Sequence, residues 1–235
     1  MTIARRRLQG SIACGLAGVT LALGLSALTP AKANAYGDFS NGVLTIPGGE
    51  GNIVPRCAND GEITVSGVPV NNGPVFCRDL KRIVASVCGK NAKFDFSLLP
   101  ADLGGGQGPI EIQATSQATA GECFGEAPGD DKFIGAARHI NIFDAGLGYD
   151  SLIGGDLDDT LAGGGDGDKM DGLGGKDTLR GGTGSDKLVG GLGADSLFGG
   201  ASSDKLLGGP GRDLLKGGGS SDKLVGGPGK DTEKQ

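Results

Sequence analysis

An aspartate recurs at every ninth residue through the C-terminal part of this 235-residue chain. Each aspartate occupies the sixth place of a unit that reads G-G-x-G-x-D-x-U-x, where U is a large apolar residue. Carboxylate oxygens are hard ligands of the kind that Ca²⁺ prefers. We therefore expect several calcium ions to bind along the series. The expected carboxylate ligands are Asp150, Asp159, Asp168, Asp177, Asp186, Asp195, Asp204, Asp213, Asp222 and Asp231.

The glycines of each unit are the residues that must position these carboxylates. Glycine adopts positive φ without a steric penalty, so the first, second and fourth places allow a tight turn whose amides and carbonyls point inward. Carbonyl oxygens of such turns are further candidate calcium ligands. The glycines expected at the calcium sites are Gly172, Gly175, Gly181, Gly184, Gly190, Gly193, Gly208, Gly211, Gly226 and Gly229.

The last three residues of each unit form a minimal strand whose middle side chain faces the core. Two units complete one coil, and coils stack in parallel at about 4.8 Å. Stacked aspartates then repel by roughly 1 kcal/mol in water and about 3.5 kcal/mol at an effective dielectric of about 20. Because one apolar residue per unit offsets little of this, residues 145–235 are expected to be disordered without calcium and to fold with it. The apolar core residues are Leu161, Met170, Leu179, Leu188, Leu197, Leu206, Leu215 and Leu224.

The nonapeptide resembles the RTX, or hemolysin-type, calcium-binding repeat. Residues 181–189 and 190–198 carry the pattern most clearly. The resemblance implies an all-β fold, a right-handed parallel β-roll (β-solenoid) with Ca²⁺ ions between its stacked turns. Bacterial secreted calcium-binding proteins of this type often begin with a degenerate, disulfide-bearing section that leads into the regular repeats.

A second period, twice as long, runs inside the repeat. Lysine follows the aspartate in alternate units only, which predicts two chemically distinct faces for a coil of two units. The lysines are Lys169, Lys187, Lys205 and Lys223. The units between them carry Thr178, Ser196, Leu214 and Thr232.

The fourth place of the unit also differs between the two faces. One face keeps Gly175, Gly193, Gly211 and Gly229 there, whereas the lysine-bearing face has Asp166, Ser202 and Ser220. Positive φ is costly for serine. We therefore expect tighter calcium sites along the Asp177–Asp231 series and looser or missing sites around Asp204 and Asp222.

The lysine-bearing face has an apolar residue at the ninth place, expected to point outward. One interpretation is strand propensity alone; the other is a contact stripe for self-association or for a cell-surface component. These residues are Ile153, Val189, Leu207 and Val225.

Residues 1–35 are expected to be a secretory signal peptide. Arg5, Arg6 and Arg7 precede an apolar stretch over residues 11–28, and small-x-small cleavage sequences end at Ala33 and Ala35. A retained membrane anchor is the alternative interpretation. Cleavage would remove four basic residues and no acidic one, which changes the net charge from −6 to −10. Such a chain is not expected to bind nucleic acid or to insert stably into a membrane.

Four cysteines remain after the leader, all before the repeats. An even number in an exported chain predicts two disulfides, with three possible connectivities. Local pairs, Cys57–Cys77 and Cys88–Cys123, are favoured. A metal–thiolate site is the alternative, but no C-x₂-C pair exists and His139 is the only histidine.

Residues 36–144 consist of short alternating apolar runs separated by Gly, Pro and Asn, which indicates strands and turns. We expect an irregular β-solenoid that caps the array, with a small β-sandwich as the alternative. Asn141 and Phe143 occupy the aspartate and U places, and Lys93 is read as an aspartate place that has changed. At the other end, Glu233 replaces the apolar residue, as a polar end-cap would. The strand-like runs are residues 43–46, 62–65, 83–87, 94–96, 110–112 and 139–143.

These patterns favour a secreted, non-enzymatic calcium-binding protein with a surface, matrix or adhesion role. One alternative is an enzyme accessory or small hydrolase with its site in residues 36–144; another is a relative of the cytolysins. No H-E-x-x-H motif exists, and triad chemistry would depend on His139 alone, for which a structural role is expected.

Overall fold

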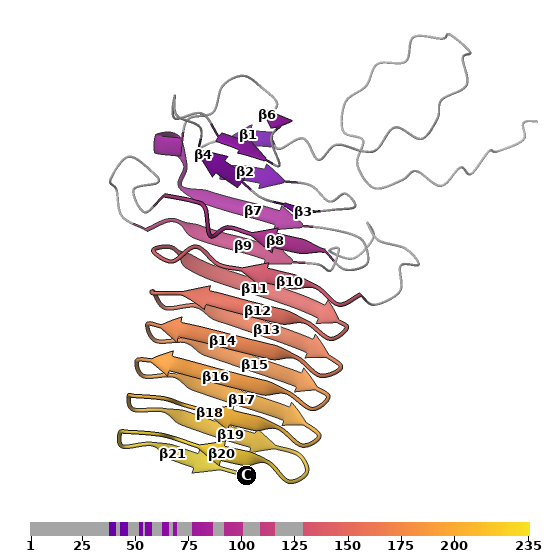
Figure 1. Ribbon diagram of the computed structural model, residues 1–235, viewed down its shortest axis with the longest axis vertical. Coiled ribbons are helices and arrows are strands. Elements are labelled where there is room, and N and C mark those ends of the chain that lie inside the picture. Colours follow the sequence, from indigo (N-terminus) through magenta and orange to yellow (C-terminus); the bar gives the residue numbers. More distant parts are fainter. Residues whose placement is uncertain are drawn as a thin grey trace, which may run out of the picture.

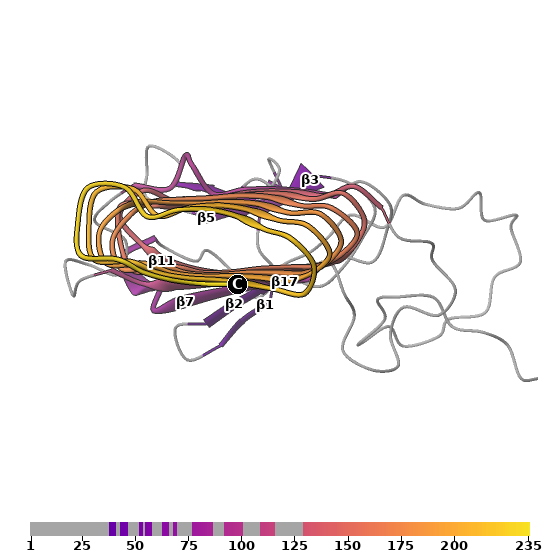
Figure 2. The ribbon, with the colours of Figure 1, turned by 90° about the horizontal axis from the view of Figure 1, so that it is seen from below.

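The structure is a computed structural model that describes residues 38–40, 43–46, 52–53, 55–57, 63–65, 68–69, 77–86, 92–100, 109–115 and 129–235. Its strands stack one above another into a solenoid, with β1 and β2 at one end and β21 at the other (Figure 1). Viewed from below, the coils superimpose as a flattened ring with two long sides (Figure 2). The fold is therefore an all-β parallel solenoid, as predicted.

Two sheets form the long sides of the ring. The first sheet has ten strands and the second has eight, and from β7 onward successive strands of the chain alternate between them, so that each coil contributes one strand to each sheet. The first contains β1 (Asp38–Ser40), β2 (Val43–Ile46), β7 (Arg82–Ser86), β9 (Glu111–Thr115), β11 (Ile140–Leu147), β13 (Thr160–Gly165), β15 (Thr178–Thr183), β17 (Ser196–Ala201), β19 (Leu214–Gly218) and β21 (Thr232–Lys234). The second contains β3 (Asn52–Ile53), β8 (Lys93–Asp95), β10 (Lys132–Ile134), β12 (Ser151–Gly155), β14 (Lys169–Gly174), β16 (Lys187–Leu192), β18 (Lys205–Leu207) and β20 (Lys223–Val225).

The strand register confirms a coil of two nonapeptides. Lys169 pairs with Lys187 in the second sheet, and Leu179 pairs with Leu197 in the first, each one coil apart in a parallel ladder. Each U side chain therefore stacks on the U side chain of the next coil. The column in the first sheet (Leu161, Leu179, Leu197, Leu215) is fully buried.

The C-terminal coil ends in side chains that satisfy backbone groups. The Gln235 side chain accepts a hydrogen bond from the Asp222 amide (3.1 Å) and donates one to the Asp222 carbonyl (3.2 Å). Glu233 accepts the Gly226 amide at 2.7 Å. Gln235 thereby does for Asp222 what the next aspartate does elsewhere in the ladder, which fits the expected polar end.

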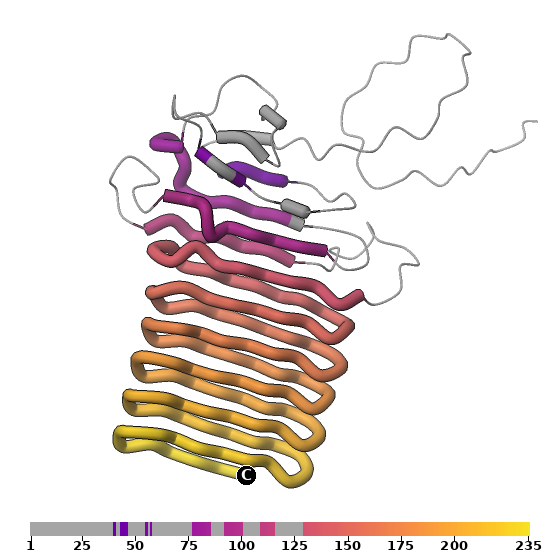
Figure 3. The backbone as a smooth tube through the Cα atoms, viewed as in Figure 1, coloured from indigo at the N-terminus to yellow at the C-terminus, as the bar shows by residue number. Residues whose placement is uncertain are grey.

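The section before the repeats continues the stack of coils (Figure 3). Its strands extend both sheets in parallel, except that β1 pairs with β2 in the antiparallel direction. All six strand-like runs of the sequence lie at least partly in strands. The column that holds aspartate in the array runs back through Asn141 to Ile112, Ile83 and Leu44, the last three of which are fully buried. An irregular solenoid is therefore correct, and the sandwich alternative is wrong.

Four buried phenylalanines fill the core where the irregular section meets the array. Phe94 stacks on Phe133 at 4.5 Å between ring centroids, and Phe143 lies 5.3 Å from Phe133 and 5.9 Å from Phe96. These rings bridge the two sheets. They supply more buried apolar area than the two U residues of a regular coil.

One assignment from the sequence is wrong by one residue. Lys93 was read as the changed aspartate place, but Phe94 pairs with Phe133 as the U residue. Strand alternation puts the aspartate place two residues before U, which is Ala92, and the Ala92 amide donates to the Asp131 carboxylate at 2.5 Å. Lys93 instead pairs with Lys132 on the outer surface.

A small third sheet of β4 (Pro55–Cys57), β5 (Ile63–Val65) and β6 (Val68–Pro69) is antiparallel. A disulfide joins Cys57 in β4 to Cys77 at the start of a single 3-10 turn, η1 (Cys77–Asp79), and this is one of the two expected pairs. The other pair, Cys88 with Cys123, and residues 1–35 lie outside the described residues. Within the described residues no helix is long and apolar enough to cross a membrane.

Candidate metal centres

The aspartates form two straight ladders inside the turns, one beside each sheet. In both ladders a carboxylate Oδ1 accepts the backbone amide of the aspartate one coil earlier: Asp204 Oδ1 takes the Asp186 amide, and Asp213 Oδ1 takes the Asp195 amide, both at 2.8 Å. The amide of one aspartate thus orients the carboxylate of the next. This bond repeats at each step of both ladders from Asp150 and Asp159 onward.

The second oxygen of these carboxylates has a different environment. In the described residues, eight aspartates hold an Oδ2 that is buried and accepts no hydrogen bond. An unsatisfied buried carboxylate oxygen is costly unless a cation or a donor reaches it. Such atoms, in eight of the ten repeat units, are what rows of bound cations would require. The eight are Asp150, Asp168, Asp177, Asp186, Asp195, Asp204, Asp213 and Asp222.

A glycine carbonyl oxygen lies close to this Oδ2 in the turns. A Cβ built on Gly190 would lie 2.5 Å from Oδ2 of Asp195 and 2.7 Å from the carbonyl oxygen of Gly208 one coil on. The same two kinds of oxygen adjoin Gly172, Gly181 and Gly208. Glycine is thus required at the first place because any side chain would occupy the space between two oxygens of the type that Ca²⁺ takes.

The fourth-place glycines face the backbone of the preceding coil. A Cβ on Gly193, Gly211 or Gly229 would collide with the carbonyl oxygen of the equivalent residue one coil earlier. Gly175 and Gly184 are confined in the same way, by Leu157 and Asp166. These glycines therefore set the close approach of the turns rather than open space for a ligand.

Burial raises the pKa of the ladder carboxyls, and neighbouring aspartates raise the values further in most cases. The pKa of Asp168 rises to about 8 and that of Asp177 to about 7, while Asp150, Asp159 and Asp186 rise to about 6. Backbone hydrogen bonds to the carboxylates oppose the shift without cancelling it. Asp168 and Asp177, whose pKa values rise most, therefore retain protons near neutral pH unless a cation compensates their charge.

The described residues contain no cluster of three His, Cys, Asp or Glu side chains that could hold a metal ion. Each candidate site instead has a carboxylate from its own unit and carbonyl oxygens of the turns. Such a set of oxygens suits Ca²⁺, which accepts backbone carbonyls in flexible geometry, and not Zn²⁺, which takes nitrogen and sulfur ligands.

Residues 171–206 and 198–233 match the family described as RTX calcium-binding nonapeptide repeat (4 copies). These are RTX calcium-binding nonapeptide repeats. No curated protein and no solved structure matches the chain. The RTX repeats and the solenoid together make the array a calcium-binding β-roll.

The two faces of the RTX array differ at the fourth place, as the sequence indicated. Asp166, Ser202 and Ser220 adopt left-handed φ values of 66°, 78° and 71°. Only glycine takes this conformation freely, so the serines store strain in their turns. Leu173, at the second place of a turn on the other face, also takes a left-handed φ of 73°, which the nine-residue pattern does not predict.

One aspartate of the ladder was missed from the sequence. Asp131 is buried, its amide donates to Asp150 Oδ1 at 2.7 Å, and its carboxylate accepts the Ala92 amide. The signal was present, because Asp131-Lys132-Phe133-Ile134-Gly135 repeats the order of residues 186–190. An extra residue in the following turn breaks the nine-residue count and hides it.

At the start of the ladder beside the first sheet, the side-chain oxygens of Asn141 and Asp159 all accept hydrogen bonds from protein groups. The Asn141 amide group donates to the carbonyls of Ala136 and His139 and to Asp159 Oδ1, and its oxygen accepts the Ala136 amide. Asp159 Oδ2 accepts the Gly155 amide at 2.5 Å. Protein groups therefore satisfy this step, unlike the steps below it.

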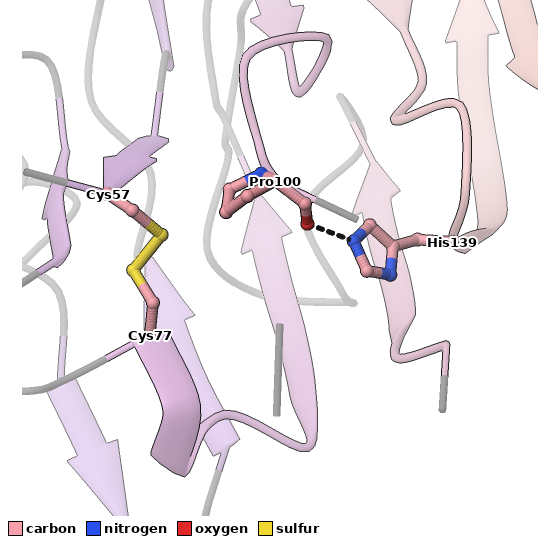
Figure 4. Close-up of a disulfide and its surroundings, with 4 residues drawn as sticks. All are labelled: Cys57, Cys77, Pro100 and His139. Carbon is pink, nitrogen blue, oxygen red and sulfur yellow. Dashed lines mark hydrogen bonds between the residues drawn. A yellow bond between two sulfur atoms is a disulfide. The ribbon is translucent and has the colours of Figure 1, made fainter. Parts of the chain in front are cut away.

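His139 is buried and held by two backbone groups. Its Nε2 lies 2.8 Å from the Pro100 carbonyl, to which it donates, and its Nδ1 accepts the Ile110 amide at 3.2 Å (Figure 4). Burial lowers its pKa, which favours the neutral ring that these two bonds require. Figure 4 also places the Cys57–Cys77 disulfide in this part of the solenoid. Both ring nitrogens are engaged in joining segments of the chain.

Proposed function

We propose that the array of residues 145–235 folds when Ca²⁺ binds between its stacked turns, and that the folded β-roll is itself the functional part of a secreted, non-enzymatic protein. The observation that carries this proposal is the row of eight buried Oδ2 atoms without a hydrogen-bond donor. The ten repeat aspartates and the first-place glycine carbonyls are the proposed ligands.

The energetic argument follows from the pKa values. Carboxyls whose pKa is raised in the folded state destabilise the fold at neutral pH, where they must either ionise in place or retain a proton. A bound divalent cation stabilises the ionised form and satisfies Oδ2. Because the unfolded chain does not bring these oxygens together, the binding energy of calcium becomes folding energy.

The section 36–144 is proposed to be a cap that needs no cation. Most of its described aspartate places lack a carboxylate: Ile83, Ile112 and Ala92 occupy three of them, and Asp131 is the carboxylate next to the array. Four phenylalanine rings fill the junction with the array. The strands β10 (Lys132–Ile134) and β11 (Ile140–Leu147) offer a parallel edge on which β12 and β13, the first strands of the calcium-dependent array, can form. A template of this kind lowers the cost of nucleating a repeat array.

Secretion is proposed from the leader of residues 1–35, and a surface, matrix or adhesion role from the flat, extended sheets of the solenoid. The only histidine of the chain has both ring nitrogens bonded to backbone groups, which supports a non-enzymatic function.

The test is far-UV circular dichroism of the chain lacking residues 1–35, first in EDTA and then with increasing CaCl₂. We expect a cooperative gain of β-structure with calcium, and calorimetry on the same sample should show several bound ions. Magnesium is the matched control, because it dehydrates reluctantly and demands octahedral geometry, so it should not replace calcium. Identical spectra with EDTA and with calcium would refute the proposal.

A further inference from the structure

A row of lysines runs along the outer surface of the second sheet. The strand register places Lys93 beside Lys132, and Lys132 beside Ser151. Below Ser151 the row continues without a break through four further coils. The lysines of the row are Lys93, Lys132, Lys169, Lys187, Lys205 and Lys223.

These ammonium groups are exposed and almost all lack a carboxylate partner in the described structure. Lys93 forms an ion pair with Asp95 at 3.1 Å, whereas no ion pair joins the other five to a described acidic residue. The one acidic side chain on the neighbouring outward row of the array is Asp171, whose Oδ1 accepts the Leu173 amide at 3.3 Å. The row therefore keeps most of its positive charge.

Stacked lysines are unfavourable for the fold itself. Like charges directly opposite each other on neighbouring strands destabilise a sheet. Charges of both signs, interspersed over the surface, are sufficient to keep a protein soluble, so solubility does not explain a row of one sign. The equivalent outward row of the first sheet has no lysine in its described strands, and carries Thr160, Thr178 and Ser196. In its other outward row, Phe198 separates the basic residues Arg180 and Lys216.

An apolar row lies beside the lysines, two residues further along each strand. Ile134 pairs with Ile153 near the top of the array, and Val189 pairs with Leu207 and then Val225 lower down. Val225 is 42% exposed, and the others are half-buried. The surface thus offers a line of cations, interrupted at Ser151, beside an apolar strip that is interrupted at Asp171.

We propose that this lysine row binds a linear acidic polysaccharide whose chain runs parallel to the solenoid axis, with carboxylates on the ammonium groups and sugar C–H faces on the apolar strip. The inference rests on the proposed function, because the row exists only when the array is folded. The cations repeat at the strand spacing of about 4.8 Å, a distance close to the advance of one ring in an extended β-linked pyranose chain.

The regularity of the row favours a linear polymer over other polyanions. A fluid layer of anionic lipids requires no fixed spacing between cations. Single-stranded nucleic acid is held by aromatic stacking as well as charge, and this strip has no aromatic side chain in its described outward positions. Because the chain as a whole has a net charge of −6, a polyanion is attracted only where basic residues cluster, as they do in this row.

The experiment measures binding of mannuronate oligomers, which carry one carboxylate on each ring, to the calcium-loaded chain without residues 1–35. We expect affinity to rise with oligomer length until the oligomer spans the row, and to fall as salt is added. Replacing Lys169, Lys187, Lys205 and Lys223 with glutamine should weaken binding by at least about tenfold, since each ammonium near a polyanion contributes through counterion release.

The matched control replaces Arg180, Lys216, Lys230 and Lys234 with glutamine, which removes the same charge from other exposed places. Its affinity should stay near that of the unchanged chain. Circular dichroism in the same buffer shows whether each variant is folded: a chain that calcium does not fold refutes the proposed function, whereas a folded chain that does not bind the oligomer refutes only the polysaccharide. Equal weakening in both variants, or tighter binding to phosphatidylglycerol vesicles or to an oligothymidylate, would also overturn this inference.

Discussion

Changing Asp177 to asparagine should have opposite effects on the calcium-free and calcium-bound protein. Asp177 is fully buried, its Oδ1 accepts the Asp159 amide at 2.8 Å, and its Oδ2 has no hydrogen-bond partner in the described structure. Asparagine keeps the acceptor and removes the buried charge. Asn141, at the equivalent place two coils earlier, shows that the fold accommodates this side chain with every polar atom bonded.

The magnitude follows from the raised pKa of Asp177. Burial raises it from 3.8 to about 7, and a difference of about three pKa units corresponds to about 4 kcal/mol at about 1.4 kcal/mol per unit. Screening by solvent at the turns reduces this to about 1–3 kcal/mol. Because the folded-state pKa is above the unfolded value, the penalty is absent below about pH 4 and complete above about pH 7. Asp177→Asn should therefore stabilise the calcium-free array by about 1–3 kcal/mol at about pH 7.5.

The assay is folding driven by an osmolyte in EDTA, followed by circular dichroism, together with a calcium titration of the same protein. Asp177→Asn should fold at a lower osmolyte concentration and yet require at least about tenfold more calcium, because a ligand charge is lost. Asp171→Asn, which removes a charge from the outer surface, is the control and should change neither midpoint appreciably. A destabilised calcium-free state, or an unchanged calcium midpoint, would refute the reasoning.

Four further outcomes follow from the structure. Acidification in EDTA from about pH 8 to about pH 5.5 should increase β-structure, because Asp150, Asp168 and Asp186 have raised pKa values and protonation then removes the buried charge that calcium otherwise compensates. A circular dichroism signal that does not change over this range would contradict this expectation. Asp195→Ala should reduce the number of calcium ions counted by calorimetry more than Asp204→Ala, since Ser202 strains the turn before Asp204; equal losses would count against the two-face asymmetry. Leu173→Gly should stabilise the calcium-loaded protein by about 1 kcal/mol in thermal unfolding because it relieves a left-handed φ, whereas Leu192→Gly, at an exposed place without positive φ, should not. Removing the Cys57–Cys77 disulfide by a double change to alanine should destabilise the irregular section by about 3 kcal/mol and raise the calcium midpoint, because that section is the proposed template for the array; an unaltered midpoint would show that the two fold independently.

The array was predictable because several independent features of its sequence indicate the same fold. The nine-residue period, the recurring lysines and the single U residue already specify a coil of two units with its aspartates stacked. Asp131 escaped because one inserted residue breaks the count. The sequence pattern placed the changed aspartate at Lys93, one residue after its true position at Ala92. Only the alternation of the strand shows that Phe94 points inward as the U residue, which puts the aspartate place at Ala92.

The irregular section was harder to predict for a physical reason. Alternating runs such as residues 83–87 and 110–112 show that strands exist but do not show which strands pair. The stacking of Ile83 on Ile112 and of Phe94 on Phe133 depends on loops of unequal length, which a period cannot describe. The sequence indicated an irregular solenoid through its resemblance to the RTX type and through the positions of Asn141 and Phe143, which continue the period of the repeat for one unit.

The sequence alone determined the repeat, the coil, the ligand class and the two-faced character of the array, because these depend on local turns and on a period that the chain repeats ten times. Tertiary structure decided what each oxygen of an aspartate does. Stacking brings one carboxylate oxygen to the amide of the preceding coil and leaves the other buried beside a glycine carbonyl, since neither partner is a neighbour in sequence. The same stacking joins Lys93 and Lys132 to the four lysines of the array, in one row that no nine-residue count reveals.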